Sequence, residues 1–275
     1  MGPAFFMPAM EEKMGGNGQS AGHGSRAKVT PRAQKPKAAA DIVSLRALAQ
    51  KSGTKADREL AQAVEQAYTQ TKPDADQNDT QTQAFFNAIG WADNKPTVVA
   101  TEQALEVEKF LGNVNGQYFY HTDAPEGAVA DAKVFADQQL DGRHFLSNGI
   151  HGDGTYWSND VDDSWRYGHY MTNSYQIKGM LNTNAKVIKE GALDKKIDAF
   201  RRSHPGAYNA IIAMYAKKGS SRKSVFAALF GYNVIEARQG GHDYLAVLDR
   251  SATTVVRQGI HRKDYDSGAK EWKNM

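Results

Sequence analysis

Cysteine is absent from this sequence of 275 residues, so disulfide cross-links and structural zinc sites with thiolate ligands are excluded. No apolar run is long enough to span a membrane, and the N-terminal segment around Phe5 and Phe6 lacks the charged-then-apolar layout of a signal peptide. The net charge of +3 is too small to steer the whole molecule toward nucleic acid. These absences lead us to expect a soluble protein with no membrane partner.

Metal-binding and phosphate-binding motifs are also missing. The glycine-rich run Gly149–Gly154 lacks the Lys and the following Ser or Thr of a phosphate-binding loop, so we expect a loop that leads into a strand. The polar run Asn159–Asp163 has neither the spacing nor the distal Glu of an EF-hand. We expect no metal site, because no metal-ligand spacing is found among the histidines His144, His151, His169, His242 and His261.

Composition divides the chain into three parts. Residues 1–40 are rich in Gly, Ala, Pro, Lys and Met without periodicity, which predicts a disordered basic arm, because little apolar surface is available to offset the entropy of ordering. This arm offers a contact for nucleic acid, although a solvated tail is the favoured interpretation. Residues 41–80 are predicted to be a helical extension, in which Ile42–Ala49 and Leu60–Tyr68 form a hairpin that packs on the core or on another chain.

Residues 81–265 alternate between helical and strand patterns, which predicts an α+β domain. Helical spacing is found at Thr82–Ile89, Glu102–Leu111, Val129–Gln139, Leu193–Phe200, Ala207–Ala216 and Ser224–Phe230. Strand composition is found at Lys95–Ala100, Gln117–His121, Gly154–Ser158, Ala185–Lys189, Tyr232–Glu236, Tyr244–Leu248 and Thr253–Arg257. Gly231 is placed to cap the last helix. This order fits two small sheets that flank a cleft.

The segment Gly154–Tyr167 joins a short strand to a helix in a way that suits a flat ring ligand. Tyr156 lies in the strand, and the polar run Asn159–Asp163 supplies turn and N-cap chemistry. Ser164 and Tyr167 follow at i and i+3 on one helix face. Two phenol rings and a hydroxyl would converge there on a heteroaromatic ring. The alternative is that these aromatics are ordinary half-buried residues.

This segment resembles the nicotinamide-binding motif of the ADP-ribosyltransferase superfamily, in the branch of poly(ADP-ribose) polymerases and diphtheria toxin that is named for a His, Tyr, Glu triad. That motif is a Gly-x-Tyr-Phe strand followed by a Ser and a Tyr on the next helix. The corresponding residues here, with no insertion, are Gly154, Tyr156, Trp157, Ser164 and Tyr167.

The resemblance extends in both directions, over roughly Phe85 to Arg262. Upstream, Gln117–His121 is similar to the strand that ends in the triad histidine. Downstream, His242–Asp249 is similar to the strand that opens with the catalytic carboxylate, which places Asp243 there. The layout also resembles transferases found in phage head-associated and bacterial toxin-like proteins.

The resemblance implies an α+β fold with a split β-sheet core and flanking helices, and it implies NAD as a substrate. It implies that the catalytic residues are His121, Tyr156 and Asp243. It implies that NAD is bound by His121, Thr122, Tyr156, Ser164 and Tyr167. Of these, His121 would hold the adenosine-side ribose.

The reaction explains the other roles. Nicotinamide leaves NAD through an oxocarbenium-like transition state, so the ring must be held still and the charge on the sugar must be stabilised. By resemblance, Tyr156 and Tyr167 would sandwich the ring, and Ser164 and the backbone of Thr122 would bind the carboxamide. Asp243 would accept a hydrogen bond from the nicotinamide ribose and face the cationic transition state.

Two positions depart from the family pattern. The triad carboxylate is Asp243 instead of Glu, and the family's His-Gly pair is His121-Thr122. The Ser-Thr-Ser and Glu-x-Glu motifs of arginine-directed toxins are absent, so that specificity is not expected. Both triad ends also have ordinary interpretations, because His121 would suit a satisfied strand-end histidine and Asp243 the end of the Gly240–Gly241 turn.

We therefore predict a toxin-like or phage effector enzyme of the glycosyltransferase (pentosyltransferase) class, a mono-ADP-ribosyltransferase. It would cleave NAD and transfer ADP-ribose to a macromolecular acceptor, with protein favoured, in the host-cell cytoplasm or on a virion. One alternative is a catalytically weak or inactive phage-particle or interaction protein that keeps the fold. The other is an NAD glycohydrolase that uses the same pocket without an acceptor.

Overall fold

The structure of this chain is a computed structural model. It describes residues 42–70, 85–86, 89–91, 94–99, 103, 106, 109, 118–123, 151, 154–165, 174–214, 221–262, 266 and 273–274. All of them belong to one unit of the chain, Pro36–Met275. The arm predicted for residues 1–40 lies outside the described residues, as does the helix predicted at Val129–Gln139.

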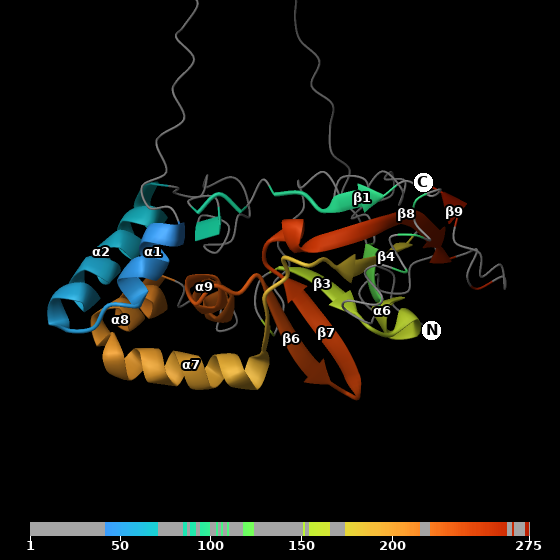
Figure 1. Cartoon of the computed structure of the whole chain (residues 1–275). Helices are drawn as coiled ribbons and strands as arrows, with labels where there is room; N and C mark the ends of the chain where they lie inside the picture. Colours follow the sequence, from blue (N-terminus) through green and yellow to red (C-terminus); the bar gives the residue numbers. More distant parts are fainter. Residues whose placement is uncertain are drawn as a thin grey trace, which may run out of the picture. The chain divides into compact units, whose positions relative to one another are not determined.

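The described elements form a mixed α and β structure, in agreement with the predicted α+β class (Figure 1). A nine-stranded sheet has the strand order β1-β8-β4-β2-β3-β7-β6-β5, and β9 pairs with β8. The strands are β1 (Thr97–Val99), β2 (Phe119–Asp123), β3 (Thr155–Ser158), β4 (Tyr175–Leu181), β5 (Val187–Lys189), β6 (Val234–Gln239), β7 (His242–Val247), β8 (Thr253–His261) and β9 (Lys273–Asn274).

These strands form one continuous sheet, whereas the sequence predicted two small sheets that flank a cleft. The reason is β3, which pairs on both edges. It shares four residue pairs with β7, from Thr155↔Val247 to Ser158↔Tyr244. It shares a single pair with β2, Tyr120↔Ser158. The sheet is therefore continuous, but the β2–β3 junction is one residue pair wide.

The longer helices gather beside the β6–β7 end of the sheet (Figure 1). The helices are α1 (Ile42–Ala49), α2 (Thr54–Gln70), α6 (Val161–Ser164), α7 (Glu190–Ser203), α8 (Pro205–Met214) and α9 (Ser221–Leu229). Within the described ranges, none of the helices combines the length and apolar character needed to cross a bilayer.

Two hydrophobic clusters cover opposite faces of the sheet. Tyr156 and its pairing partner Ala246 belong to the cluster that the helices complete. The next residues along each strand, Trp157 and Leu245, belong to the second cluster. This division follows from strand geometry, because successive side chains point to opposite faces. Adjacent aromatic residues of the Tyr-Trp motif therefore serve different cores.

The helical hairpin of α1 and α2 shares its core with the rest of the unit. Leu45 and Leu60 are fully buried in the same cluster as Phe226 of α9. Asp57 of α2 is also buried, and its carboxylate accepts the backbone N–H groups of Gly206 (2.8 Å) and Ala207 (2.8 Å). These N–H groups lie in the first turn of α8, where they have no partner within the helix. The hairpin, for which the sequence predicted packing on the core or on another chain, thus shares a hydrophobic cluster with α9 and caps α8.

Candidate functional site

Three neighbouring strands hold the predicted catalytic residues. His121 lies on β2, Tyr156 on β3 and Asp243 on β7, and these strands are adjacent in the order β2-β3-β7. Gly154 allows the close approach of β3 to β7, because a Cβ at this position would lie 2.7 Å from the carbonyl oxygen of Val247. The glycine of the Gly-x-Tyr motif is therefore required by strand packing.

His121 is held at the narrow β2–β3 junction. Its ring lies 5.2 Å from the ring of Trp157, with 40° between the planes. Its Nδ1 lies 2.6 Å from the carbonyl oxygen of Tyr156. A carbonyl only accepts, so Nδ1 carries the proton in this contact and Nε2 is the nitrogen that can accept in the neutral ring. The contact adds a link across a junction with a single ladder pair.

Asp243 lies one residue beyond a tight hairpin turn. Gly240 and Gly241 both have positive φ (62° and 93°) and connect paired Gln239 and His242, as expected for a two-residue turn of the primed type. The predicted turn is confirmed, and it places Asp243 second in β7. The Asp243 side chain is 34% exposed, so its carboxylate reaches solvent.

Asn159 holds Asp243 through three hydrogen bonds. The Asn159 N–H donates to the Asp243 carbonyl (3.0 Å), and its Nδ2 donates to the Asp243 carboxylate (3.3 Å). The Asp243 N–H donates in return to Asn159 Oδ1 (3.0 Å). Arg238 Nε lies 3.8 Å from the carboxylate, but its side chain is 75% exposed, so this pair contributes little. The carboxylate is thus both fixed and accessible.

His121 and Asp243 belong to one face of the sheet. His121 contacts Trp157, Trp157 is paired with Leu245, and Asp243 precedes Leu245 by two residues on β7. Residues two apart on a strand share a face. Tyr156 lies on the opposite face, is 7% exposed and packs in the helix-side cluster. The structure therefore places His121 and Asp243 on one face of the sheet, on strands separated by β3, and the Tyr156 ring on the other face.

Thr122 and Ser164 form a buried hydroxyl pair. Their Oγ1 and Oγ atoms lie 2.8 Å apart, and both side chains are buried. Gln176 of β4 donates from Nε2 to Thr122 Oγ1 (3.1 Å) and to the carbonyl of Val161 (2.9 Å). Among the described residues, the buried Oε1 of Gln176 has no hydrogen-bond partner. The predicted carboxamide-binding residues thus lie together, beside an unused acceptor.

The short helix α6 is fastened to the sheet by Asp163. Its carboxylate accepts from the hydroxyls of Tyr244 (2.6 Å) and Ser158 (3.1 Å). The helix begins as predicted, because the Asp160 side chain accepts from the N–H of Asp163 (2.8 Å) and caps the N-terminus. This fastening sets the position of Ser164. Tyr167 lies outside the described residues.

The Tyr156 hydroxyl meets a network of charged groups. It accepts from the N–H of His151 (3.0 Å), and His151 Nδ1 lies 3.1 Å from the carboxylate of Glu190. Lys223 also donates to Glu190. Burial alone would raise the pKa of Glu190, but the hydrogen bonds and charges of Lys223 and His151 outweigh it and lower that pKa. For Lys223, burial favours a lower pKa, and Glu190 and Asp194 together raise it.

The pKa of Tyr120 and the arrangement of potential metal ligands also concern the site. Burial raises the pKa of Tyr120, and the nearby charge of Asp160 adds to this effect. Within the described ranges, no cluster of three His, Asp or Glu side chains is arranged to hold a metal ion. Sequence reasoning did not identify Asn159 or Gln176 as site residues. Asn159 directly follows β3, the strand that holds Tyr156. Its role becomes apparent only from the register of β3 and β7, which places Asn159 next to Asp243.

Comparisons with known proteins leave the family open. No protein-family model matches this sequence, and no match is found among curated proteins. One solved structure, described as the crystal structure of an anti-CRISPR protein, is 12% identical and aligns with 51% of this chain and 97% of its own. The TM-score of that alignment is 0.28, which is too low to show a shared fold.

Proposed function

We propose that this chain is a mono-ADP-ribosyltransferase that cleaves NAD and transfers ADP-ribose to a macromolecular acceptor, with protein favoured. The observation that supports the proposal most is the adjacency of β2, β3 and β7. These are the strands that the family resemblance selects, and their register puts His121 and Asp243 on one face. The host-cell cytoplasm or a virion remains the proposed place of action.

In the proposed reaction, the bond between the ribose carbon and the nicotinamide nitrogen breaks, and nicotinamide leaves with the bonding pair. An acceptor nucleophile then forms a bond to the ribose carbon and loses a proton. Asp243 would stabilise the cationic sugar, because its carboxylate is held by Asn159 before the charge develops. His121, with Nδ1 engaged by the Tyr156 carbonyl, would present its other nitrogen to the adenosine-side ribose.

The roles of Thr122, Ser164 and Tyr156 rest on the resemblance. A hydroxyl donates one hydrogen bond and accepts two, so Ser164 keeps capacity for a carboxamide beyond its bond to Thr122. Tyr156 supports the site through its carbonyl, which orients His121. Its stacking on nicotinamide stays a prediction, as does that of Tyr167.

The test is nicotinamide release from NAD by the purified full chain, together with covalent labelling from NAD that carries a label in its adenosine half. Asp243→Asn keeps the shape of the side chain but removes the charge, so turnover should fall about a hundredfold or more while NAD binding changes little. The matched control is Asp198→Asn, an exposed carboxylate on α7 that should leave turnover unchanged. Equal turnover in Asp243→Asn and wild type would remove Asp243 from the mechanism.

One observation favours the second candidate, an interaction protein that keeps the fold without turnover. Ser164 and Thr122 are 0% and 3% exposed and hydrogen-bond to each other, as in a closed site. The same assay separates the candidates. Nicotinamide release with label on protein supports a transferase, release without label supports an NAD glycohydrolase, and neither signal supports the interaction protein.

A further inference from the structure

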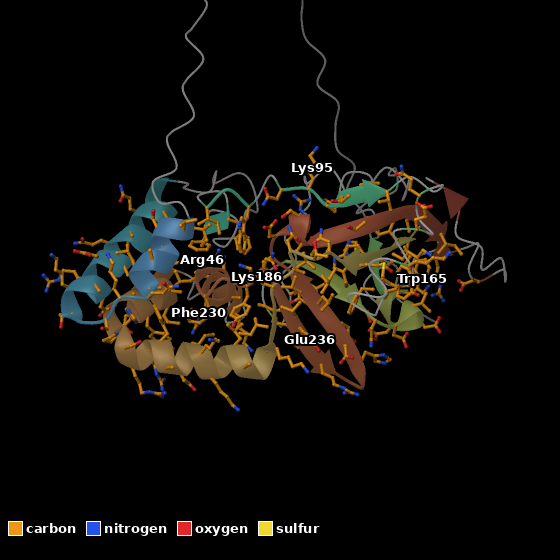
Figure 2. All side chains as sticks on the ribbon, in the orientation of Figure 1. Arg46, Lys95, Trp165, Lys186, Phe230 and Glu236 are labelled. Carbon is orange, nitrogen blue, oxygen red and sulfur yellow. The ribbon has the colours of Figure 1, made fainter. Side chains whose placement is uncertain are left out.

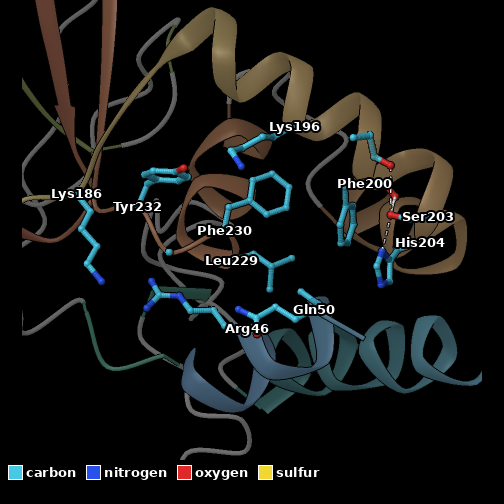
Figure 3. Close-up of a pocket in the computed structure, with 13 residues that line it drawn as sticks. Arg46, Gln50, Lys186, Lys196, Phe200, Ser203, His204, Leu229, Phe230 and Tyr232 are labelled. Atoms are coloured by element: carbon cyan, nitrogen blue, oxygen red, sulfur yellow. Dashed lines mark hydrogen bonds between the residues drawn. The ribbon is translucent and has the colours of Figure 1, made fainter. Parts of the chain in front are cut away.

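A cavity of about 610 Å³ lies between α1, α7 and the turn that follows α9 (Figure 3). Its volume is in the range of small-molecule binding sites. Gly231 makes the turn possible through its positive φ of 93°, and it places the residues on either side of it in the cavity wall. The side chains that define the chemistry of the cavity are Arg46, Lys186, Lys196, Phe200, Phe230 and Tyr232.

Three of these side chains carry a positive charge, and none of the described residues that line the cavity is acidic. Figure 3 shows the charged ends of Lys186 and Arg46 on the same side of the cavity. In the described part of the chain, neither Lys186 nor Lys196 forms an ion pair with a carboxylate. Cationic side chains that line a cavity with no acidic residue in its wall favour an anionic ligand.

Arg46 is held in place before any ligand arrives. Its Nε donates to the carbonyl of Ala228 in the last turn of α9 (2.9 Å), and its guanidinium lies 5.6 Å from the ring centroid of Trp91. Burial lowers the pKa of Arg46, and the charge of Asp249 opposes this effect. Asp249 is already engaged, since its Oδ1 accepts from Ser251 Oγ (2.7 Å). A partly desolvated, fixed guanidinium is suited to binding phosphate.

The wall beside these cations is aromatic. Phe200 is 5% exposed and stacks on His204 at 4.8 Å and 12°. Phe230 and Tyr232 are half-buried, and Lys196 Nζ lies 5.9 Å from the centroid of the Tyr232 ring. The cavity thus offers Arg46 and Lys186 at one side and flat apolar surface, with Lys196 beside it, at the other (Figure 3). A ligand that joins a phosphate to an aromatic base matches both parts.

We propose that this cavity binds a nucleoside phosphate. The phosphate lies between Arg46 and Lys186, and the base packs against the aromatic wall, where Lys196 lies. The ligand is either a free nucleotide or a nucleotide unit of a single-stranded nucleic acid, which share this chemistry. The cavity is separate from the candidate NAD site, because Figure 2 shows Arg46 and Lys186 well apart from Trp165, the residue after Ser164.

The test is calorimetric titration of the full chain with ATP, AMP, adenosine, inorganic phosphate and a short oligothymidylate. ATP and AMP should bind more tightly than adenosine or phosphate alone, and more weakly as salt increases. Lys186→Ala should weaken ATP binding about tenfold, as expected for the loss of one charge-assisted contact, and Lys196→Ala, which removes a cation beside the aromatic wall, should weaken it less. Both lysines are exposed, so these variants should fold.

Matched controls are Lys195→Ala and Lys189→Ala, exposed neighbours that do not line the cavity and should bind ATP as wild type does. Tighter binding of the oligothymidylate than of AMP would identify single-stranded nucleic acid as the source of the ligand. Tighter binding of AMP would identify a free nucleotide. The proposal is overturned if none of the probes binds, if adenosine or phosphate alone binds as well as ATP, or if the four lysine variants bind alike. NAD cleavage is not measured, so the result is independent of the proposed function.

Discussion

Asp243 and Ser164 are the candidate site residues whose surroundings differ most. The Asp243 carboxylate is 34% exposed and fixed by Asn159, so it can meet a cation without rearrangement. The Ser164 hydroxyl is fully buried against Thr122. A carboxamide must therefore enter a closed space or take over that contact. The part of the site that would stabilise charge is preformed, whereas the part that would hold the ring is not.

Glu190 gives a prediction for the pH dependence of stability. Its lowered pKa means that the contribution of the ionised carboxylate is present above the ordinary glutamate pKa and is lost as pH falls through the lower folded value. Glu190→Gln should reduce the free energy of unfolding by about 1 kcal/mol near neutral pH. The difference from wild type should shrink below about pH 4. Urea denaturation at several pH values measures it.

The raised pKa of Lys223 sets the high-pH end of the range in which the Glu190–Lys223 pair stabilises the fold. Its raised pKa means that its contribution is present below the ordinary lysine pKa and is lost as pH rises through the raised folded value. The matched control is Glu59→Gln. The Glu59 carboxylate lies 3.9 Å from Lys55, whose side chain is 92% exposed, so the change should have little effect on stability at any pH. A Glu190→Gln effect that is the same at every pH would contradict the assignment.

At the scale of elements, periodicity explains which parts were predictable. The helices α7, α8 and α9 were predicted within a few residues, because each has apolar residues at helical spacing. The strand β4 was not predicted. Its residues Tyr175–Leu181 are buried on both faces and include Lys178 and Gly179, so no alternating pattern marks it. Only its pairing with β2 and β8 makes it a strand.

The contact of Asp57 with α8 was equally beyond sequence reasoning, because 149 positions separate Asp57 from Gly206. Asp57→Ala should lower the free energy of unfolding by about 2 kcal/mol, since it removes a helix cap and leaves two backbone N–H groups without their acceptor. Asp57→Asn should have a smaller effect, because one acceptor oxygen remains. Chemical denaturation measures both, with the exposed Glu65→Ala on the same helix as the control. A wild-type midpoint for Asp57→Ala would show that the cap is dispensable.

At the scale of the whole molecule, the candidate site depends on strand order. The resemblance selected three segments, but it could not supply the bonds between Asn159 and Asp243, which are 84 residues apart. It also could not reveal that Tyr156 and Trp157 serve opposite cores, because that depends on which cluster each face meets. The alternation of helical and strand patterns predicted the α+β class, and long-range packing determined the geometry.

The division of the chain into units predicts the effect of a truncation. All described contacts lie within Pro36–Met275. Deletion of residues 1–35 should therefore leave the thermal unfolding midpoint unchanged, and NAD cleavage should stay intact if the proposed function holds. Calorimetry and the nicotinamide assay on the truncated chain provide the measurement. A lower midpoint would show that the first 35 residues contribute to the folded unit.

The single-pair junction between β2 and β3 also has a consequence for folding. On one side of it lie β2, β4, β8 and β1, and on the other β3, β7, β6 and β5. The chain passes from one side to the other between β2 and β3, β3 and β4, β4 and β5, and β7 and β8. Neither side is a continuous stretch of sequence, and the side of β2, β4, β8 and β1 cannot be completed before β8, which follows all four strands of the other side along the chain. We expect slow folding with one cooperative transition, because β8 lies inside the sheet between β1 and β4 and pairs with segments far from it in sequence.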